Sequence, residues 1–274
     1  EKDELLFQIK KDGRLCRLLI SASASLPLAY LTDTNKPSPM TAPNFCMLLR
    51  KHIGSARIVS VSQPGLERII EITLEHLDEM GDLCRKKLIV EIMGKHSNII
   101  FCKEDGTILD SIKHISAQVS SVREVLPGRT YFIPQTVEKA DPLTVTQEEF
   151  SDRLSRSASN IQKALYSSFT GISPVIADEL CFLASIDPDR GAQDLSEIET
   201  IHLYRTLCLM MEDVKEGRFT PNIIYEEEKP VEFASLPLTC FSDPKYRRTE
   251  FASISQVLQT YYASRGVITR IRQK

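Results

Sequence analysis

The 274-residue sequence predicts an α+β fold in which an antiparallel-sheet domain is followed by a helical domain. Two observations predict this order. Between residues 57 and 112, strand-like runs follow one another with short turns and no intervening helix, whereas residues 146–217 have helical periodicity. The composition supports buried cores, because 42% of the residues are hydrophobic and 26% are charged, which are ordinary globular values.

A β-hairpin is the first predicted element. Leu5–Ile9 and Leu15–Ser21 have the composition of strands, and the pair Asp12-Gly13 between them is a turn signal. Residues 32–43 contain three prolines among polar residues and are predicted to form a loop.

A short helix and a run of strands follow the loop. Residues 44–53 have apolar side chains at helical spacing, with Asn44 as the expected N-cap. Farther along, Ile70, Ile72 and Leu74 alternate with polar residues and should share one face of a strand. Together the strands predict an antiparallel meander, and they are Arg57–Ser62, Arg68–Leu74, Lys87–Met93, Asn98–Lys103 and Thr107–Ile112.

The second half begins with helices. Thr146 and Glu149 have the spacing of a capping box at a helix start. A glycine turn at Gly171, followed by Ser173-Pro174 at the start of another helix, predicts a helix-hairpin-helix. After residue 217 we expect the strands Pro221–Tyr225 and Val231–Leu238.

A final helix is predicted over Ile254–Lys274, where Val257 and Tyr261 recur at helical spacing. We expect it to be the start of a coiled coil, and its basic end carries Arg265, Arg270, Arg272 and Lys274. The composition shifts along the chain predict three parts: residues 1–140, 141–217 and 218–274.

Charge and cysteine content exclude several protein classes. The formal net charge is −3 and the sequence pI is about 6.0, so a protein that coats DNA without specificity is disfavoured. The seven cysteines show no CxxC spacing, which argues against a disulfide framework and against a zinc site. No signal peptide and no apolar run of about 18 residues is visible, so we expect a cytoplasmic protein without a membrane span.

Enzyme motifs are also missing from the sequence. There is no GxSxG, no Walker A loop and no GxGxxG after a strand. Asp110, Arg123 and Glu124 could form an acid–base set, but solvated charges are the favoured interpretation. We therefore expect no catalytic residues, no metal and no cofactor.

Glu67-Arg68, at the start of a predicted strand, is the first candidate site. The pair could be a solvated pair at a sheet edge, or an arginine aimed at phosphate or base edges and oriented by its acidic neighbour. Neighbouring residues of a regular strand point to opposite faces, so a shared site needs a bulge or a strand end. Gly65 just before the pair is compatible with a bulge.

The loop Gly94–Asn98 is the second candidate. It could be an ordinary hairpin connection, because Gly, Ser and Asn favour turns. Alternatively, its donors could contact an anion or RNA, and these donors are Lys95, His96, Ser97 and Asn98. The turn Gly171–Pro174 could bind a phosphate backbone, but it contains no Lys or Arg and is interpreted as a structural joint.

Several motifs together resemble the NFACT-N domain of the fibronectin-binding protein A / RqcH family, which is related to eukaryotic NEMF. They run in family order across nearly the whole chain. The matching segments are Met47–Ile53, Gly65–Ile70, Glu91–Ile100, Ile108–Ile112, Arg123–Tyr131 and Gly171–Pro174.

The resemblance implies a fold like that of formamidopyrimidine-DNA glycosylase and a role in ribosome-associated quality control. The family binds tRNA, in bacteria tRNA-Ala, and the large ribosomal subunit bearing a stalled peptidyl-tRNA, and it supports template-free C-terminal tailing. Its tRNA-engaging residues correspond here to Glu67-Arg68, where Glu replaces the usual Asp, and to Glu91-Ile92-Met93. The family's opening helix is expected to be missing from this chain.

Two other functions remain open alongside tRNA and ribosome binding. The fold resemblance suggests a glycosylase-like DNA-binding domain, although those enzymes use an N-terminal Pro-Glu and this chain begins Glu1-Lys2. The older family name suggests a surface adhesin that binds fibronectin, against which the lack of a secretion signal argues.

Overall fold

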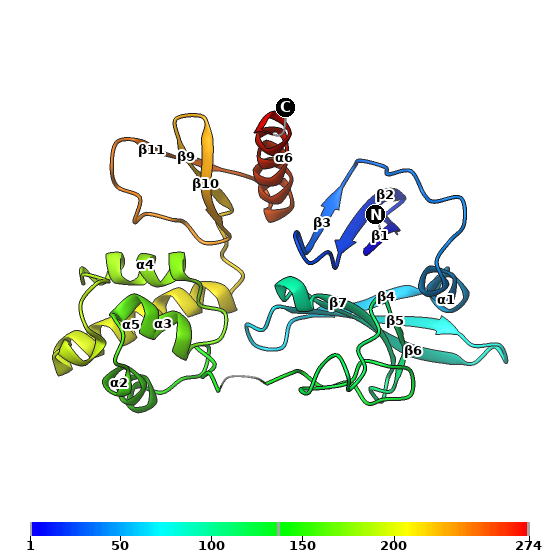
Figure 1. Cartoon of the computed structure of the whole chain (residues 1–274), viewed down its shortest axis with the longest axis horizontal. Helices are drawn as coiled ribbons and strands as arrows, with labels where there is room; N and C mark the ends of the chain where they lie inside the picture. Colours follow the sequence, from blue (N-terminus) through cyan, green and yellow to red (C-terminus); the bar gives the residue numbers. More distant parts are fainter. Residues whose placement is uncertain (1, 136–137, 273–274) are drawn as a thin grey trace. The chain divides into compact units, whose positions relative to one another are not determined.

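The computed structural model describes residues 2–135 and 138–272, with side chains described as far as residue 264. It divides into two compact units, Glu1–Val137 and Glu138–Lys274 (Figure 1). Both contain helices and antiparallel sheets, which confirms the predicted α+β class. None of the described helices combines the length and the apolar character needed to cross a membrane.

The first unit opens with a three-stranded antiparallel sheet. It consists of β1 (Glu4–Lys11), β2 (Arg14–Ser21) and β3 (Leu28–Thr32) in that order. Asp12 and Gly13 have φ of 51° and 77°, the left-handed pair that a two-residue hairpin requires. The predicted hairpin is therefore confirmed, and β3 is an additional strand.

Helix α1 (Asn44–Ile53) has the predicted bounds and buries Phe45 and Leu49. The predicted N-cap is wrong: Pro43 occupies the cap position, and no side chain caps the helix. Asn44 already lies in the first turn, and the first backbone bond runs from the Met47 N–H to the Pro43 carbonyl at 3.0 Å.

A five-stranded antiparallel meander follows, with its strands in chain order, as predicted. The second strand begins at Ile69 rather than at Arg68, and the third is longer at its start than expected. The bounds are β4 (Arg57–Ser62), β5 (Ile69–Leu77), β6 (Leu83–Glu91), β7 (Asn98–Lys103) and β8 (Ile108–Ser111).

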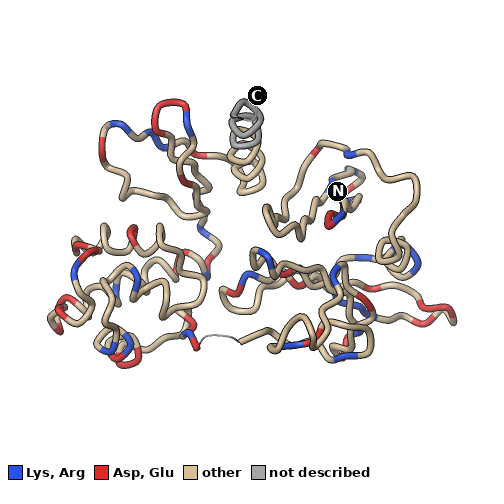
Figure 2. Tube along the Cα trace, in the orientation of Figure 1, with Lys and Arg blue, Asp and Glu red and all other residues tan. Residues whose placement is uncertain are grey.

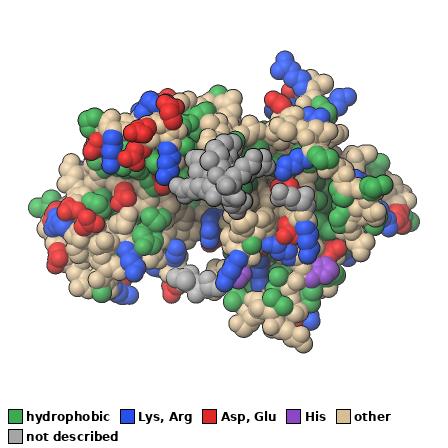
Figure 3. All heavy atoms as spheres, turned by 45° about the horizontal axis from the view of Figure 1, so that its top comes forward, with side chains coloured by type: hydrophobic (Ala, Val, Ile, Leu, Met, Phe, Trp, Pro, Cys, Tyr) green, Lys and Arg blue, Asp and Glu red, His purple; other side chains and the backbone are tan. Residues whose placement is uncertain are grey.

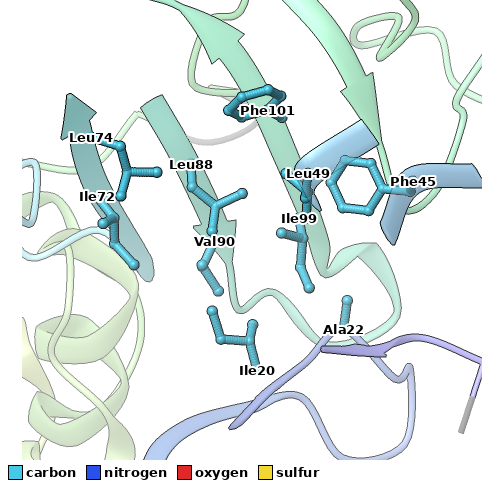
Figure 4. Close-up of a cluster of buried hydrophobic side chains, with 10 residues drawn as sticks. All are labelled: Ile20, Ala22, Phe45, Leu49, Ile72, Leu74, Leu88, Val90, Ile99 and Phe101. Carbon is cyan, nitrogen blue, oxygen red and sulfur yellow. The ribbon is translucent and has the colours of Figure 1, made fainter. Parts of the chain in front are cut away.

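Hydrophobic clusters cover both faces of this meander. On one face, side chains of β5, β6 and β7 pack against Ile20 and Ala22 from β2 and its end, and against Phe45 and Leu49 of α1 (Figure 4). Ile70, Ile72 and Leu74 all belong to or pack on this cluster, which confirms the predicted alternation. On the other face, a second cluster includes Ile69, Ile89 and Ile100, and Val125 from the segment after β8 covers it.

The second unit begins with the predicted helices. They are α2 (Gln147–Arg156), α3 (Ile161–Ser168), α4 (Pro174–Leu183) and α5 (Glu197–Lys215). Thr146 caps α2 by accepting a hydrogen bond from the Glu149 N–H at 3.2 Å. Gly171 has φ of 79°, and Ser173 caps α4 with Pro174 as its first residue, so the helix-hairpin-helix is confirmed.

A second three-stranded sheet and a long helix complete this unit. The strands β9 (Asn222–Glu226), β10 (Lys229–Ala234) and β11 (Tyr246–Glu250) lie in the order β10-β9-β11, and α6 spans Ile254–Arg272. The predicted strand Val231–Leu238 ends early, and β11 was not predicted. The basic residues expected at the end of α6 lie outside the described side chains.

Candidate functional site

The predicted site residues gather at one end of the three central strands of the meander. Glu91 is the last residue of β6, and it pairs with Ile69 of β5 on one side and Asn98 of β7 on the other. Arg68 directly precedes β5, and its carbonyl accepts a hydrogen bond from the Ile92 N–H at 2.9 Å. The sheet therefore brings the Glu67-Arg68 pair, Glu91 and the loop after Glu91 together.

Glu67 and Arg68 lie at a strand end, as a shared site requires. The chain turns at Gly65, whose φ of 55° favours glycine, and the Glu67 N–H bonds the Pro64 carbonyl at 3.1 Å. Gln63 donates through Nε2 to the Glu67 carbonyl at 2.8 Å. This bonded turn leaves Glu67 half-buried and Arg68 exposed.

The loop after Glu91 is a single 3₁₀ turn over Gly94–His96, shaped from within by Ser97. The buried Ser97 hydroxyl donates to the Gly94 carbonyl at 2.7 Å and accepts from the Met93 N–H at 2.8 Å. Gly94 has φ of 58°, which suits glycine. As a result Lys95 and His96 are held on a closed turn with exposed side chains.

Asn98 anchors the segment that follows β8. Its side chain is only 2% exposed, and its Nδ2 donates to the Lys113 carbonyl at 3.0 Å while its Oδ1 accepts from the Lys113 N–H at 3.1 Å. The polar groups of Ser97 and Asn98 are thus hydrogen-bonded inside the protein. Ile92 and Met93 are half-buried, so Arg68, Lys95 and His96 are the members of the predicted set that are both basic and exposed. We call these three residues the basic group.

A buried ionic cluster, formed by Glu91, Arg123 and Tyr131, lies beneath this end of the sheet. The Glu91 carboxylate is buried and accepts hydrogen bonds from Arg123 Nη2 and, at 2.9 Å, from the Tyr131 hydroxyl. Arg123 also lies over the Tyr131 ring, with Cζ 5.4 Å from the centroid, and donates through Nη1 to the Phe132 carbonyl at 2.6 Å. We call Glu91, Arg123 and Tyr131 the Glu91 cluster.

The surroundings of Tyr131 keep its phenol protonated. Burial raises the pKa of Tyr131, and the negative charge of Glu91 raises it further. The Tyr131 hydroxyl is therefore a permanent donor at neutral pH. A buried ion pair recovers its desolvation cost only with good geometry and added hydrogen bonds. The contacts of Arg123 and Tyr131 with Glu91 therefore hold the segment after β8, which we call the covering segment, in one position.

Arg123 and Tyr131 were not predicted as partners of Glu91. They lie 32 and 40 residues away in the sequence, and no local pattern reports such a contact. The alternative acid–base set is divided between separate pairs: Asp110 contacts His114 at 2.6 Å, and Glu124 contacts Arg129 at 2.8 Å. Among the described residues, no group of three or more His, Cys, Asp or Glu side chains is placed to hold a metal ion.

The Gly171–Pro174 turn has different surroundings. Ile172 is buried, and the Ser173 hydroxyl accepts from the Ile176 N–H at 3.3 Å. Ile172 packs in the core and Ser173 caps α4, so the turn joins α3 to α4 as the structural interpretation expects.

Charges of both signs are interspersed along the chain (Figure 2), and the face drawn in Figure 3 carries basic, acidic and hydrophobic side chains side by side. This agrees with the net charge of −3. Attraction to a polyanion must then arise locally, from residues such as the basic group.

Comparison with known proteins gives matches over the full chain. A family model described as NFACT N-terminal and middle domains matches residues 1–274. The Rqc2 homolog RqcH of Bacillus subtilis (strain 168) is 33% identical over 274 residues, which cover 100% of this chain and 45% of that protein. The chain thus spans less than half the length of the curated relatives it matches.

A solved structure has the same fold. The N-terminal part of the fibronectin/fibrinogen-binding protein from Streptococcus suis superposes with a TM-score of 0.76 at 29% identity, covering 96% of this chain and 88% of that one. A partial match also exists: formamidopyrimidine-DNA glycosylase of Listeria monocytogenes is 28% identical over 137 residues, 47% of this chain and 49% of that enzyme.

Proposed function

This chain belongs to the family of NFACT N-terminal and middle domains, and from that premise we propose that it is the RNA-contacting module of a cytoplasmic ribosome quality control factor. In this proposal it binds tRNA, with tRNA-Ala as the expected species, and the large ribosomal subunit that carries a stalled peptidyl-tRNA. It thereby supports template-free C-terminal tailing. The similarity to the Rqc2 homolog RqcH supports this assignment.

The observation that carries the proposal is the basic group at the end of the central strands. Arg68, Lys95 and His96 are exposed, and their backbones are held by bonded turns rather than by a free loop. Arg can donate two parallel hydrogen bonds to a phosphate, and Lys adds a point charge. Sites fixed in this way suit RNA, which proteins recognise by shape, backbone and unpaired bases.

The experiment compares tRNA binding by the 274-residue chain and by Arg68→Ala at several salt concentrations. We expect the wild type to bind tRNA-Ala in a salt-sensitive manner. Loss of one phosphate contact should weaken binding and reduce the slope of log affinity against log salt by about 0.7–0.9.

Arg14→Ala is the matched control, because Arg14 is an exposed arginine on β2 outside the basic group. Its affinity and slope should equal those of the wild type. Equal binding by Arg68→Ala and the wild type would remove Arg68 from the interface, and absence of any tRNA binding would overturn the proposed function for this chain alone.

A glycosylase-like function is the second candidate, favoured by the partial match to the Listeria enzyme. It predicts binding to oxidised duplex DNA and strand cleavage. Incubating the chain with an end-labelled duplex that contains an oxidised guanine decides between the two, since an RNA module leaves the duplex intact.

Fibronectin is the third candidate partner, because the Streptococcus suis neighbour is named for binding fibronectin and fibrinogen. Surface plasmon resonance with immobilised fibronectin tests it directly. Binding that Arg68→Ala leaves unchanged would place such an interface elsewhere on the chain.

A further inference from the structure

We propose that Phe132 is a stacking platform for an unpaired nucleobase of the bound RNA. This inference rests on the proposed RNA-binding function and adds a recognition residue that lies outside the predicted set. Phe132 follows Tyr131 in the segment that covers one face of the meander, and the residue is 52% exposed.

The exposure of Phe132 follows from the alternation of its neighbours. Tyr131 and Ile133 both pack on the hydrophobic cluster of the covered face, which contains Ile69 and Ile89. The ring between these two anchored neighbours does not belong to the cluster and is exposed to solvent. A large aromatic ring is thus exposed while both neighbours are anchored.

The Glu91 cluster fixes the backbone at this ring. Arg123 donates to the Phe132 carbonyl at 2.6 Å, and the Tyr131 hydroxyl donates to Glu91 at 2.9 Å. Burying a charged pair contributes little net stability, but its geometry is specific. Fixing the backbone beforehand reduces the conformational entropy that Phe132 would lose on binding a base.

The segment that carries Phe132 also packs on the cluster next to the strand end that carries the basic group. Ile133 and Met93 pack on the same cluster, and the Met93 carbonyl accepts from the His96 N–H at 3.0 Å. The Ile92 N–H bonds the Arg68 carbonyl at 2.9 Å. The segment that carries the ring is therefore bonded, through Arg123, to the strand end beside the exposed Arg68 and Lys95, whose charges can hold phosphates.

This combination has the chemistry of single-strand RNA recognition. Cations hold the sugar–phosphate backbone, and an aromatic face stacks on a base that has left its helix. A single rigid ring beside cations suits one splayed base, because every base has a π-face that can stack on it.

The test uses the full chain and an RNA stem-loop with 2-aminopurine in its loop. We expect Phe132→Ala to weaken binding by at least about five-fold, because base stacking on an aromatic contributes at least about that factor. The salt slope should stay at the wild-type value, since no phosphate contact is lost. Stacking of 2-aminopurine on the ring should quench its fluorescence in the wild-type complex. Phe132→Tyr, which keeps an aromatic ring, should retain both the affinity and this quenching.

Phe219→Ala is the control for loss of an exposed ring, because Phe219 is 49% exposed in the second unit. It should bind as the wild type does. Wild-type affinity in Phe132→Ala, together with weakened binding in Arg68→Ala, would overturn the stacking role and leave the proposed function standing. If the wild type binds no RNA, both are overturned.

Discussion

At the scale of single residues, Glu91 carries a buried charge, which is costly, and two side chains compensate it. Glu91 ends β6, the strand between β5 and β7, and its carboxylate is buried. Arg123 and Tyr131 supply its hydrogen bonds. Since replacing such a pair with apolar side chains is often neutral or stabilising, its use here is better explained by geometry than by stability. The geometry that it fixes is the position of the covering segment at the basic group.

Removing one partner should therefore be far more harmful than removing both. Arg123→Met leaves the buried Glu91 charge without its cationic partner, and we expect the first unit to lose about 3–5 kcal/mol of stability. Hydrogen exchange of the β6 and β7 amides measures this, because these buried strands exchange through opening of the whole unit.

The double variant Glu91→Leu/Arg123→Met should recover a large part of that loss. Arg129→Met is the matched control, since its ion pair with Glu124 leaves the arginine side chain 62% exposed and such pairs contribute about 0–1 kcal/mol. A cost for Arg123→Met as small as that of Arg129→Met would mean that the Glu91 cluster does not hold the covering segment.

The residues of the site are predictable to unequal degrees. The motifs alone indicate Arg68, Glu91 and the loop after Glu91, because each lies in a short contiguous stretch of the sequence. The sequence does not distinguish Lys95 and His96, which are exposed, from Ser97 and Asn98, whose polar groups are used internally. That distinction depends on contacts with Gly94 and Lys113 that exist only after the strands have paired.

At the scale of secondary structure elements, the two helix starts at Asn44 and Ser173 illustrate what a local signal can decide. Both residue types are favoured N-caps, but Ser173 accepts from the Ile176 N–H and Asn44 lies inside α1. We expect Ser173→Ala to cost about 1 kcal/mol and Asn44→Ala to cost nothing, because alanine is the better helix former at a position that caps nothing. Thermal unfolding followed by circular dichroism measures both variants.

Ser173→Asp serves as the positive control in that comparison, because aspartate also caps a helix and should keep wild-type stability. If Asn44→Ala were as destabilising as Ser173→Ala, the cap assignment at α1 would have to be revised.

Two strands, β3 and β11, are not predicted by the sequence, and the cause is the same for both. β3 is five residues long, and β11 has two arginines in its centre, so neither has a clear two-residue alternation. β3 is ordered by pairing with β2, and β11 by pairing with β9. By contrast, the turn at Asp12-Gly13 encodes its hairpin locally, which is why that hairpin was predicted correctly.

At the scale of the whole molecule, the division of the chain follows its hydrophobic cores. The first unit has clusters on both faces of the meander, and the second contains a separate cluster of Ile223, Val257 and Tyr261 together with a helical core. Units with their own cores generally fold on their own. The three-part division at residues 140 and 217 remains a prediction, and its second boundary can be tested.

One buried carboxylate argues that no folding boundary lies at residue 217. Glu179 of α4 is 1% exposed and accepts from the Thr239 N–H at 2.8 Å, the Cys240 N–H at 2.7 Å and the Thr239 hydroxyl. The helical part is thereby bonded to the segment that follows β10. Residues 138–274 expressed alone should consequently unfold in one transition.

Glu179→Ala should destabilise residues 138–274 by at least about 2 kcal/mol, because it leaves three part-buried donors without their acceptor. Urea unfolding followed by circular dichroism gives both the number of transitions and their midpoints. Glu212→Ala, an exposed carboxylate on α5, should leave the midpoint unchanged. Two separate transitions in the wild-type unit, with only the later segment affected by Glu179→Ala, would instead restore the boundary at residue 217, since the helices would then be stable without the strands that follow them.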